Sequence, residues 1–317
     1  EAASFRAAIS AFSVERNSYV VHIGPGPKVD APGRVRVLPE EYVQIENRTV
    51  TTAGGPPRPR IDEKLTDDGR LRILVDGTVP QQVRTLYYRR RIPEPKVHAA
   101  TLLVRALRKA GVGGELAVVY DLAPQPQPLI ADLASPPLSI LLYSVGKWSD
   151  NFSAEMLLKI MGAEAERPGT SARGVIAVRE ELERMGVNTQ GLVMVNGSGL
   201  FDGNQVAPSH LTATLVAAYH DPAIRAEYVA QLAVAGADGT LQSRLQDLPR
   251  ARMVRAKTGT LRDVVALSGY VLGAPERSLA FSFLANGVAG RQGAARNLAD
   301  DIVRALANYA VQPSADH

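Results

Sequence analysis

Two short polar segments in the second half of the chain have residue types that could serve one reaction. Ser149-Asp150-Asn151 supplies a hydroxyl, a carboxylate and a carboxamide, and Lys257-Thr258-Gly259-Thr260 supplies a cation, two hydroxyls and a glycine. Acyl transfer needs a nucleophile, a proton shuttle, donors for the oxyanion and a counter-charge for a substrate carboxylate. The two segments together supply several of these groups, so we expect them to form one site.

The first group of expected roles concerns proton transfer and the substrate amide. Lys257 is expected to act as a cation near the substrate carboxylate, and its charge would ease deprotonation of a neighbouring hydroxyl. Ser149 is that hydroxyl in this hypothesis, and it would pass a proton to the leaving amine. Asn151 carries an NH₂ and a C=O that could pair with a substrate amide.

The second group of expected roles concerns binding. The Thr258 hydroxyl could bind a terminal carboxylate, and Gly259 has no Cβ, which would let a substrate backbone approach closely. If these residues open an edge strand that continues into Val264–Leu272, the Thr260 N–H would point into the cleft as an oxyanion donor.

The nucleophile is harder to find. Acyl-transfer enzymes that use Ser-Asp-Asn and Lys-Thr-Gly motifs also use a Ser-x-x-Lys motif, which lies on a separate helix well before them. The match in this sequence is Ser144-Val145-Gly146-Lys147, which ends two residues before Ser149. That spacing is too short for two side chains that must face each other from different elements. We therefore expect Lys147 to line the cleft and the chain to lack its nucleophilic serine.

Each motif also has a purely structural interpretation. Ser149 or Asp150 could cap a helix over Phe152–Met161, and Lys257-Thr258-Gly259 could be a turn entering a strand. The joint presence of both motifs, in this order, favours function or ancestry over coincidence.

Other candidate sites fail on sequence grounds. Gly197-Ser198-Gly199 lacks the Gly-x-Ser-x-Gly pattern of a nucleophile elbow and predicts a tight turn. The five histidines show no His-Glu-x-x-His spacing, so neither a metal nor a cofactor is predicted.

Composition sets wider limits. The 317 residues are enough for two domains, and no apolar run is long enough for a transmembrane helix. The absence of cysteine suits an oxidising compartment. A net charge of +4 is too mild to mark a nucleic-acid protein, and Arg89-Arg90-Arg91 after Tyr87-Tyr88 is interpreted as a solvated strand end rather than a nucleic-acid patch.

Hydrophobic patterns predict a β-rich first half and a mixed second half. Expected strands lie at Ser10–Val14, Tyr19–Ile23, Val35–Leu38, Tyr42–Ile45, Leu71–Val75, Val83–Tyr88 and Leu116–Tyr120, and a helix over Val97–Ala110 ends at Gly111. The proline-rich stretch Ala123–Pro137 is the expected boundary. After it we expect helices at Ala172–Met185, Ser209–Tyr219 and Ala294–Tyr309 and strands at Leu192–Val195, Val264–Leu272 and Ser278–Ala285. This is an α/β (α+β) sandwich.

Five blocks in the second half carry a family resemblance. They are Lys147-Trp148-Ser149-Asp150-Asn151, Asn196-Gly197-Ser198-Gly199-Leu200, Val234-Ala235-Gly236-Ala237-Asp238-Gly239-Thr240-Leu241, Arg255-Ala256-Lys257-Thr258-Gly259-Thr260-Leu261 and Ser268-Gly269-Tyr270. The chain resembles the D-alanyl-D-alanine carboxypeptidase/endopeptidase family of class C penicillin-binding proteins, peptidase family S13, from Leu133 to Asn308. Its first half, from Ile9-Ser10-Ala11-Phe12 onward, resembles the domains inserted in that family.

The resemblance implies a β-lactamase/transpeptidase-like penicillin-binding domain with an inserted β-rich domain. Residues 1–136 would be the inserted accessory region and residues 137–317 an incomplete penicillin-binding domain. The Ser-x-x-Lys nucleophile would belong to a segment that precedes this sequence.

The implied activity is a serine-type D-Ala-D-Ala carboxypeptidase/endopeptidase that forms an acyl-enzyme. Its partners would be peptidoglycan peptides and β-lactams, with no nucleic acid and no transmembrane segment, in a periplasmic or secreted location. A homo-oligomer is left open.

One departure from the family pattern affects substrate choice. Phe201-Asp202 stands where the family commonly has Ser-Arg, so an acidic residue replaces a basic one near the cleft. Recognition of an acidic peptide side chain is therefore not expected to follow the family.

Two alternatives from other classes stay open: a non-catalytic peptidoglycan-binding or assembly module, and a secreted α/β domain whose motifs are coincidental.

Overall fold

The chain consists of two compact units in the computed structural model. The structure describes residues 8–68, 70–121, 128–200, 203–274 and 277–312. The units are Glu1–Ala131 and Asp132–His317, and each is described by itself. The assignment of residues 1–136 to an inserted region and 137–317 to an incomplete penicillin-binding domain stays a prediction.

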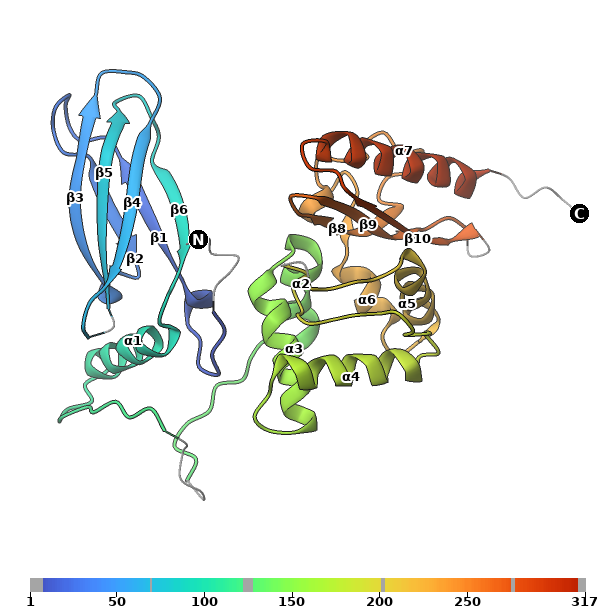
Figure 1. Ribbon diagram of the computed structural model, residues 1–317, viewed down its shortest axis with the longest axis horizontal. Helices are drawn as coiled ribbons and strands as arrows, with labels where there is room; N and C mark the ends of the chain where they lie inside the picture. Colours follow the sequence, from blue (N-terminus) through green and yellow to red (C-terminus); the bar gives the residue numbers. More distant parts are fainter. Residues whose placement is uncertain (1–7, 69, 122–127, 201–202, 275–276, 313–317) are drawn as a thin grey trace, which may run out of the picture. The chain divides into compact units, whose positions relative to one another are not determined.

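Within its described residues, the first unit contains two three-stranded sheets and one α-helix (Figure 1). Its elements are β1 (Ser18–Gly24), β2 (Arg34–Leu38), β3 (Val43–Thr52), β4 (Arg58–Leu65), β5 (Leu71–Pro80), β6 (Leu86–Arg91) and α1 (Pro95–Lys109). One sheet has the order β2-β1-β6, and the other has the order β3-β5-β4 with β3 and β5 parallel.

The core of the first unit consists of the inward-facing residues of both sheets. Tyr19, Val21 and Ile23 alternate along β1 and are fully buried, and they share one cluster with Leu71 and Ile73 of β5. Because every second residue is apolar and buried, these segments form strands with one face in the core and the other toward solvent.

The second unit alternates helices with one antiparallel sheet. Its elements are α2 (Leu138–Trp148), α3 (Asn151–Ala165), α4 (Ser171–Arg184), α5 (Pro208–His220), α6 (Arg225–Gln231), β7 (Ala233–Val234), a 3-10 turn η4 (Gly239–Leu241), β8 (Val254–Thr260), β9 (Val264–Val271), β10 (Leu279–Asn286) and α7 (Gln292–Val311). The strand order is β10-β9-β8-β7.

Helices cover both faces of this sheet (Figure 1). Leu267 and Val271 of β9 pack with Val303 of α7 on one face. Tyr270 of β9 packs on the other face with Leu215 of α5, and its hydroxyl donates to the Leu215 carbonyl at 2.6 Å. Alternate residues of β9 thus serve two cores, which is why this strand is apolar almost throughout.

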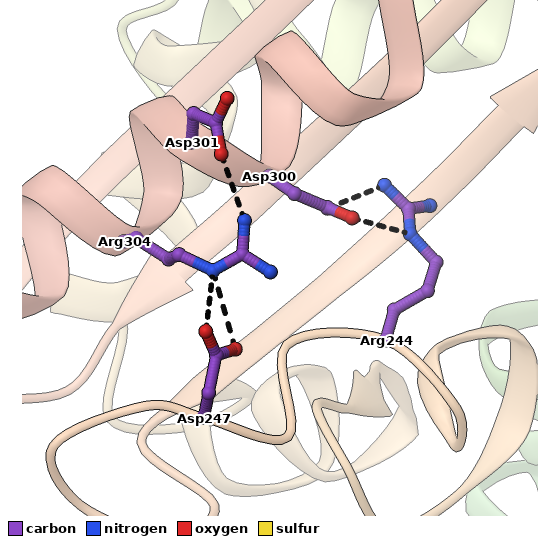
Figure 2. A network of polar contacts seen from close by, with 5 residues as sticks. All are labelled: Arg244, Asp247, Asp300, Asp301 and Arg304. Atoms are coloured by element: carbon purple, nitrogen blue, oxygen red, sulfur yellow. Dashed lines mark hydrogen bonds and ion pairs between the residues drawn. The ribbon is translucent and has the colours of Figure 1, made fainter. Parts of the chain in front are cut away.

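Paired charges anchor α7 to the segment that follows η4, as Figure 2 shows. Arg244 donates to both carboxylate oxygens of Asp300 at 2.6 and 3.2 Å, and Asp300 is buried. Arg304 bonds Asp247 and Asp301 in a more exposed position. The Arg244–Asp300 pair therefore holds α7 on its buried side, and the Arg304–Asp247 pair holds it on its exposed side.

Most expected elements are present, although three predicted strands are wrong. Residues 10–14 contain bends and no strand, and the Ser10 and Ser13 hydroxyls bond nearby carbonyls there. Residues 116–120 lie without a strand partner, and Leu192–Val195 is reduced to one bridge between Val193 and Gln205.

The boundaries and missed elements have separate reasons. The proline-rich stretch forms neither helix nor strand over 128–137, whereas residues 122–127 lie outside the described part. No element was predicted at α2, β4, α6, β7 or β8, and the helix of α3 was predicted only as an alternative. Among the described helices, none combines the length and the apolar character that a bilayer crossing requires.

Candidate functional site

The Ser-Asp-Asn segment is the junction between two helices. Ser149 follows the last residue of α2 in a left-handed conformation, with φ 58° and ψ 46°. Asp150 begins α3, and its carboxylate accepts from the Ser153 N–H and hydroxyl at 3.4 and 3.1 Å. Asp150 is therefore the helix cap that the structural interpretation proposed. The cap does not conflict with the predicted roles of Ser149 and Asn151, because it fixes the residues on either side of it.

Lys257 reaches this junction from β8. Its ammonium donates to Ser149 Oγ at 2.6 Å and to the Thr258 carbonyl at 2.7 Å. Desolvation lowers the pKa of Lys257 to about 8. Since Ser149 Oγ accepts from Lys257, the serine's own proton can be donated to another group. The expected Ser149–Lys257 pairing is thus present in the structure.

The Lys-Thr-Gly segment does not open the strand that the sequence analysis expected. It ends β8, and a turn separates it from β9, which begins at Val264. The prediction was wrong because no strand was assigned to residues 254–260, whose apolar positions are few. Lys257–Thr260 thus belongs to β8 and not to the start of β9, but it still lies at a sheet edge.

The backbone of this segment faces an open edge. Leu261 N–H donates to the Val264 carbonyl and Leu272 N–H to the Met253 carbonyl, so odd-numbered residues of β8 pair with β9. Even-numbered residues therefore point to the other side. There β7 pairs only as far as Ala256, so the backbone N–H groups of Thr258 and Thr260 face an edge that no described strand covers. This position is compatible with the predicted donor role of Thr260.

The other predicted site residues, Thr258, Gly259 and Asn151, differ in what they contact. Thr258 Oγ1 donates to Thr240 Oγ1 at 2.9 Å. A Cβ added to Gly259 would lie 3.2 Å from Ala266 Cβ, so the glycine also relieves crowding within the sheet. The Asn151 carboxamide, half-buried at the start of α3, makes no hydrogen bond within the described residues.

Lys147 is not directed freely into a cleft. Its ammonium bonds Asp238 Oδ2 at 2.7 Å and the Leu232 carbonyl at 3.0 Å, and its side chain is 15% exposed. Although partial burial acts to raise it, the pKa of Asp238 is lowered, because Lys147 and the Val234 N–H donate to the carboxylate. The geometry therefore favours a structural role, in which Lys147 holds α2 against Leu232 and Asp238, over the predicted place in the cleft.

The side chains of Ser144 and Lys147 bond different partners in this structure. The Ser144 hydroxyl donates to the Leu141 carbonyl of its own helix at 2.7 Å. The Ser144 carbonyl instead accepts the backbone N–H groups of Ser149 and Asp150. Ser144 thus contributes its backbone to the junction, and the prediction that its side chain is not the nucleophile stays a prediction.

The Asn-Gly-Ser-Gly-Leu block forms the expected tight turn. Glu155 of α3 accepts from the Ser198 N–H at 2.9 Å and from its hydroxyl at 2.6 Å. The Asn196 side chain closes the turn by bonding the Leu200 carbonyl and the Gly199 N–H. Ser198 is therefore held by a carboxylate and is not activated by a histidine. Phe201-Asp202 lies outside the described residues.

Two residues of this site were not assigned a role from the sequence. Asp238 and Thr240 lie in a block that was quoted only for its resemblance, yet they bond Lys147 and Thr258. The signal that could have found them is the Asp-x-Thr spacing, which places both side chains at the start of one short turn.

A concave surface elsewhere lacks comparable chemistry. In the first unit a depression of about 530 Å³ is lined by Glu15, Ser18, Val20, His22, Leu38, Pro39, Tyr87 and Arg89. Arg89 bonds Ser18 there at 3.0 Å and the His22 and Tyr87 rings pack edge to face. We place the candidate site at Ser149 and Lys257, because among the described residues this cluster alone joins a desolvated lysine to a hydroxyl.

Comparison with known proteins agrees with this arrangement. The chain matches the D-Ala-D-Ala carboxypeptidase 3 (S13) family over residues 1–309. It is 37% identical over 279 residues to a D-alanyl-D-alanine carboxypeptidase of Actinomadura sp., covering 86% of this chain and 51% of the relative. It is 27% identical over 296 residues to the D-alanyl-D-alanine carboxypeptidase DacB of Haemophilus influenzae, covering 89% of this chain and 59% of the relative. The chain thus spans about half the length of the curated relatives it matches.

A solved structure shares the fold. Penicillin binding protein 4 (dacB) from Haemophilus influenzae superposes with a TM-score of 0.77 at 24% identity, over 95% of this chain and 69% of that chain. A second structure of that protein, complexed with a novel β-lactam, gives a TM-score of 0.76 at 24% identity, over 94% of this chain and 71% of that chain. The expected combination of a penicillin-binding fold with a β-rich region is confirmed.

Proposed function

The chain belongs to the D-Ala-D-Ala carboxypeptidase 3 (S13) family, and we propose on that premise that it forms one wall of a serine peptidase site. The substrates would be D-Ala-D-Ala ends or cross-links of peptidoglycan peptides, cleaved through an acyl-enzyme, and β-lactams would acylate the same serine. The proposed location is periplasmic or secreted. The observation that carries the proposal is the 2.6 Å contact between Lys257 Nζ and Ser149 Oγ.

The proposed chemistry follows from that contact. Lys257 in its charged form donates to Ser149 Oγ, which leaves the Ser149 proton available to the leaving amine when the peptide or lactam C–N bond breaks. The same positive charge attracts a substrate carboxylate, and the Thr258 hydroxyl would donate to it. Asn151 would pair with the substrate amide through its carboxamide.

The open edge of β8 supports the proposed oxyanion site. The Thr260 N–H faces this edge and is a backbone donor, so it needs no reorganisation when the oxyanion forms. A peptide that lies along the edge would place its scissile carbonyl against the same donor.

The acylated serine in this proposal is not Ser144. The bonds of Ser144 to Leu141 and of Lys147 to Asp238 occupy both groups of that motif. A second Ser-x-x-Lys motif of the same protein, outside the residues of this sequence, would supply the nucleophile.

Fluorescent penicillin labelling of the full-length gene product tests the proposal. We expect the unaltered protein and Ser144→Ala to take covalent label, and Lys257→Met to be labelled at least about 100-fold more slowly, as for loss of a group that acts in the transition state. Lys109→Met, which removes an exposed lysine of α1, is the matched control and should label normally.

Two results would contradict the proposal. Label that disappears in Ser144→Ala would make Ser144 the nucleophile. An unaltered full-length protein that takes no label would favour a non-catalytic peptidoglycan-binding module instead.

A further inference from the structure

The three consecutive residues Asp238-Gly239-Thr240 contact both halves of the candidate site. Asp238 bonds the ammonium of Lys147, which lies two residues before Ser149. Thr240 bonds the hydroxyl of Thr258, which follows Lys257 directly. One short turn thus contacts the neighbours of both members of the Ser149–Lys257 pair.

Gly239 completes this set of contacts through the backbone. Its φ is 58°, and a Cβ built on it would lie 2.5 Å from the Lys147 carbonyl oxygen. Real Cβ atoms do not approach a backbone oxygen so closely, so any side chain here would push the end of α2 away. The turn therefore lies against the α2 backbone as well as against the Lys147 side chain.

The turn itself is firmly held. Leu241, the next residue, is fully buried in the core under α7. Gly236 N–H donates to the carbonyls of Leu241 and Arg244, and Arg244 is paired with Asp300 of α7. The Arg244–Asp300 pair of Figure 2 therefore connects the segment that follows the turn to α7.

We propose that Asp238, Gly239 and Thr240 form a positioning clamp that holds Ser149 and Lys257 within proton-transfer distance. The clamp rests on the proposed function, because it serves the proton transfer assigned there. Its three residues are positioning residues, since their contacts are with Lys147 and Thr258 and not with the reacting atoms.

Thr240 has a second consequence for carboxylate binding. Thr258 has one hydroxyl proton, which it donates to Thr240 Oγ1 in this structure. When Thr258 donates that proton to a substrate carboxylate, the bond between the two threonines persists only if Thr240 becomes the donor. Thr240 thus keeps Thr258 oriented in both states, and a serine at position 240 would do the same while a valine would not.

Two uncharged substitutions test the clamp. Gly239→Ala should push α2 away and Thr240→Val should remove the bond to Thr258, so that water reaches Lys257. Neither substitution changes the charged groups at this turn, which are Asp238, its partner Lys147, and Arg255, whose charge also acts on Asp238. Gly191→Ala is the matched control, because Gly191 also has a positive φ of 78° but a Cβ there meets nothing within 4 Å.

The first readout does not depend on activity. NMR titration of ¹³C-labelled lysines in the full-length protein should give Lys257 a pKa of about 8 in the unaltered protein and in Gly191→Ala. In Gly239→Ala and Thr240→Val the pKa should rise toward that of an exposed lysine, because hydration favours the charged form. An unchanged titration in Thr240→Val overturns the clamp, and this variant decides the matter if Gly239→Ala fails to fold.

The second readout is the rate of acylation by fluorescent penicillin. We expect rates about 10- to 100-fold lower in Gly239→Ala and Thr240→Val, and a rate within about three-fold of the unaltered protein in Thr240→Ser. Normal rates in both clamp variants overturn the proposal. If the unaltered protein takes no label while the lysine titration still shifts, the clamp stands and the proposed function fails.

Discussion

Removal of the Asp300 carboxylate is expected to destabilise the second unit far more than removal of Asp247. Both aspartates pair with an arginine and connect α7 with the segment after η4 (Figure 2). They differ in burial: the side chains of the Arg244–Asp300 pair are 17% and 11% exposed, and those of the Arg304–Asp247 pair are 37% and 63% exposed. They also differ in that Arg304 keeps Asp301 as a partner when Asp247 is removed. Both differences act in the same direction, so the comparison contrasts a buried pair with an exposed pair.

The magnitudes follow from that difference. Loss of one partner of a buried ion pair costs about 3–5 kcal/mol because it leaves an uncompensated buried charge. Since Arg244 keeps some access to water, we expect Asp300→Ala to cost about 2–4 kcal/mol. Asp247→Ala should cost about 0–1 kcal/mol, the usual range for an exposed pair.

Differential scanning calorimetry of the full-length protein and both variants measures these costs. For a unit of this size, 1 kcal/mol corresponds to roughly 2–4 °C in Tm. The transition of the second unit should therefore fall by about 5–15 °C in Asp300→Ala and by less than about 4 °C in Asp247→Ala. The double variant Arg244→Met/Asp300→Leu should recover much of the loss, since well-packed apolar residues can replace a buried pair.

A smaller or equal loss in Asp300→Ala compared with Asp247→Ala would refute the reasoning. It would mean that Arg244 finds water or another acceptor when Asp300 is removed, so that no charge is stranded. In that case the anchoring of the clamp to α7 would rest on the buried Leu241 and not on the ion pair.

Two further predictions concern pH. His98 of α1 is fully buried, neither ring nitrogen has a partner in the described residues, and desolvation lowers its pKa to about 4. Because the unfolded state takes up the proton first, stability should fall by about 3 kcal/mol between pH 6.5 and 4, and His98→Leu should remove that part of the slope in urea titrations at several pH values. Acylation by penicillin should decline as pH rises through about 8, where Lys257 loses the proton that it donates to Ser149; a pH profile that is flat from 7 to 9.5 would contradict the assigned role.

Local patterns in the sequence were sufficient for much of the secondary structure. The predicted helix over Ala172–Met185 appears as α4, and Gly186 follows it in a left-handed conformation, because an apolar stripe and a terminal glycine are properties of the segment itself. Strands β1, β9 and β10 were also predicted, since each has enough β-branched or apolar residues to be recognised alone.

Elements that depend on a distant partner were not predictable in this way. Strand β8 has few apolar residues and exists because β9 pairs along its whole length. Residues 116–120 have the composition of a strand but pair with no described strand, and Val119 is 80% exposed. A strand needs hydrogen-bonding partners from elsewhere in the chain, which local composition does not specify.

The same distinction applies to the candidate site. The sequence by itself determined which groups are available: a hydroxyl at Ser149, a carboxamide at Asn151 and a cation at Lys257, in an order that marks the family. The motifs also predicted that Lys257 would lie beside Ser149. Only the tertiary structure decided that Lys147, which was expected to line the cleft, binds Asp238 instead. Lys147 is two residues away along the chain, yet it bonds Asp238, whereas Lys257 reaches Ser149 from a strand end. The reason is physical, because α2 directs Lys147 toward the η4 turn, and packing of the sheet against α2 brings the end of β8 to the serine.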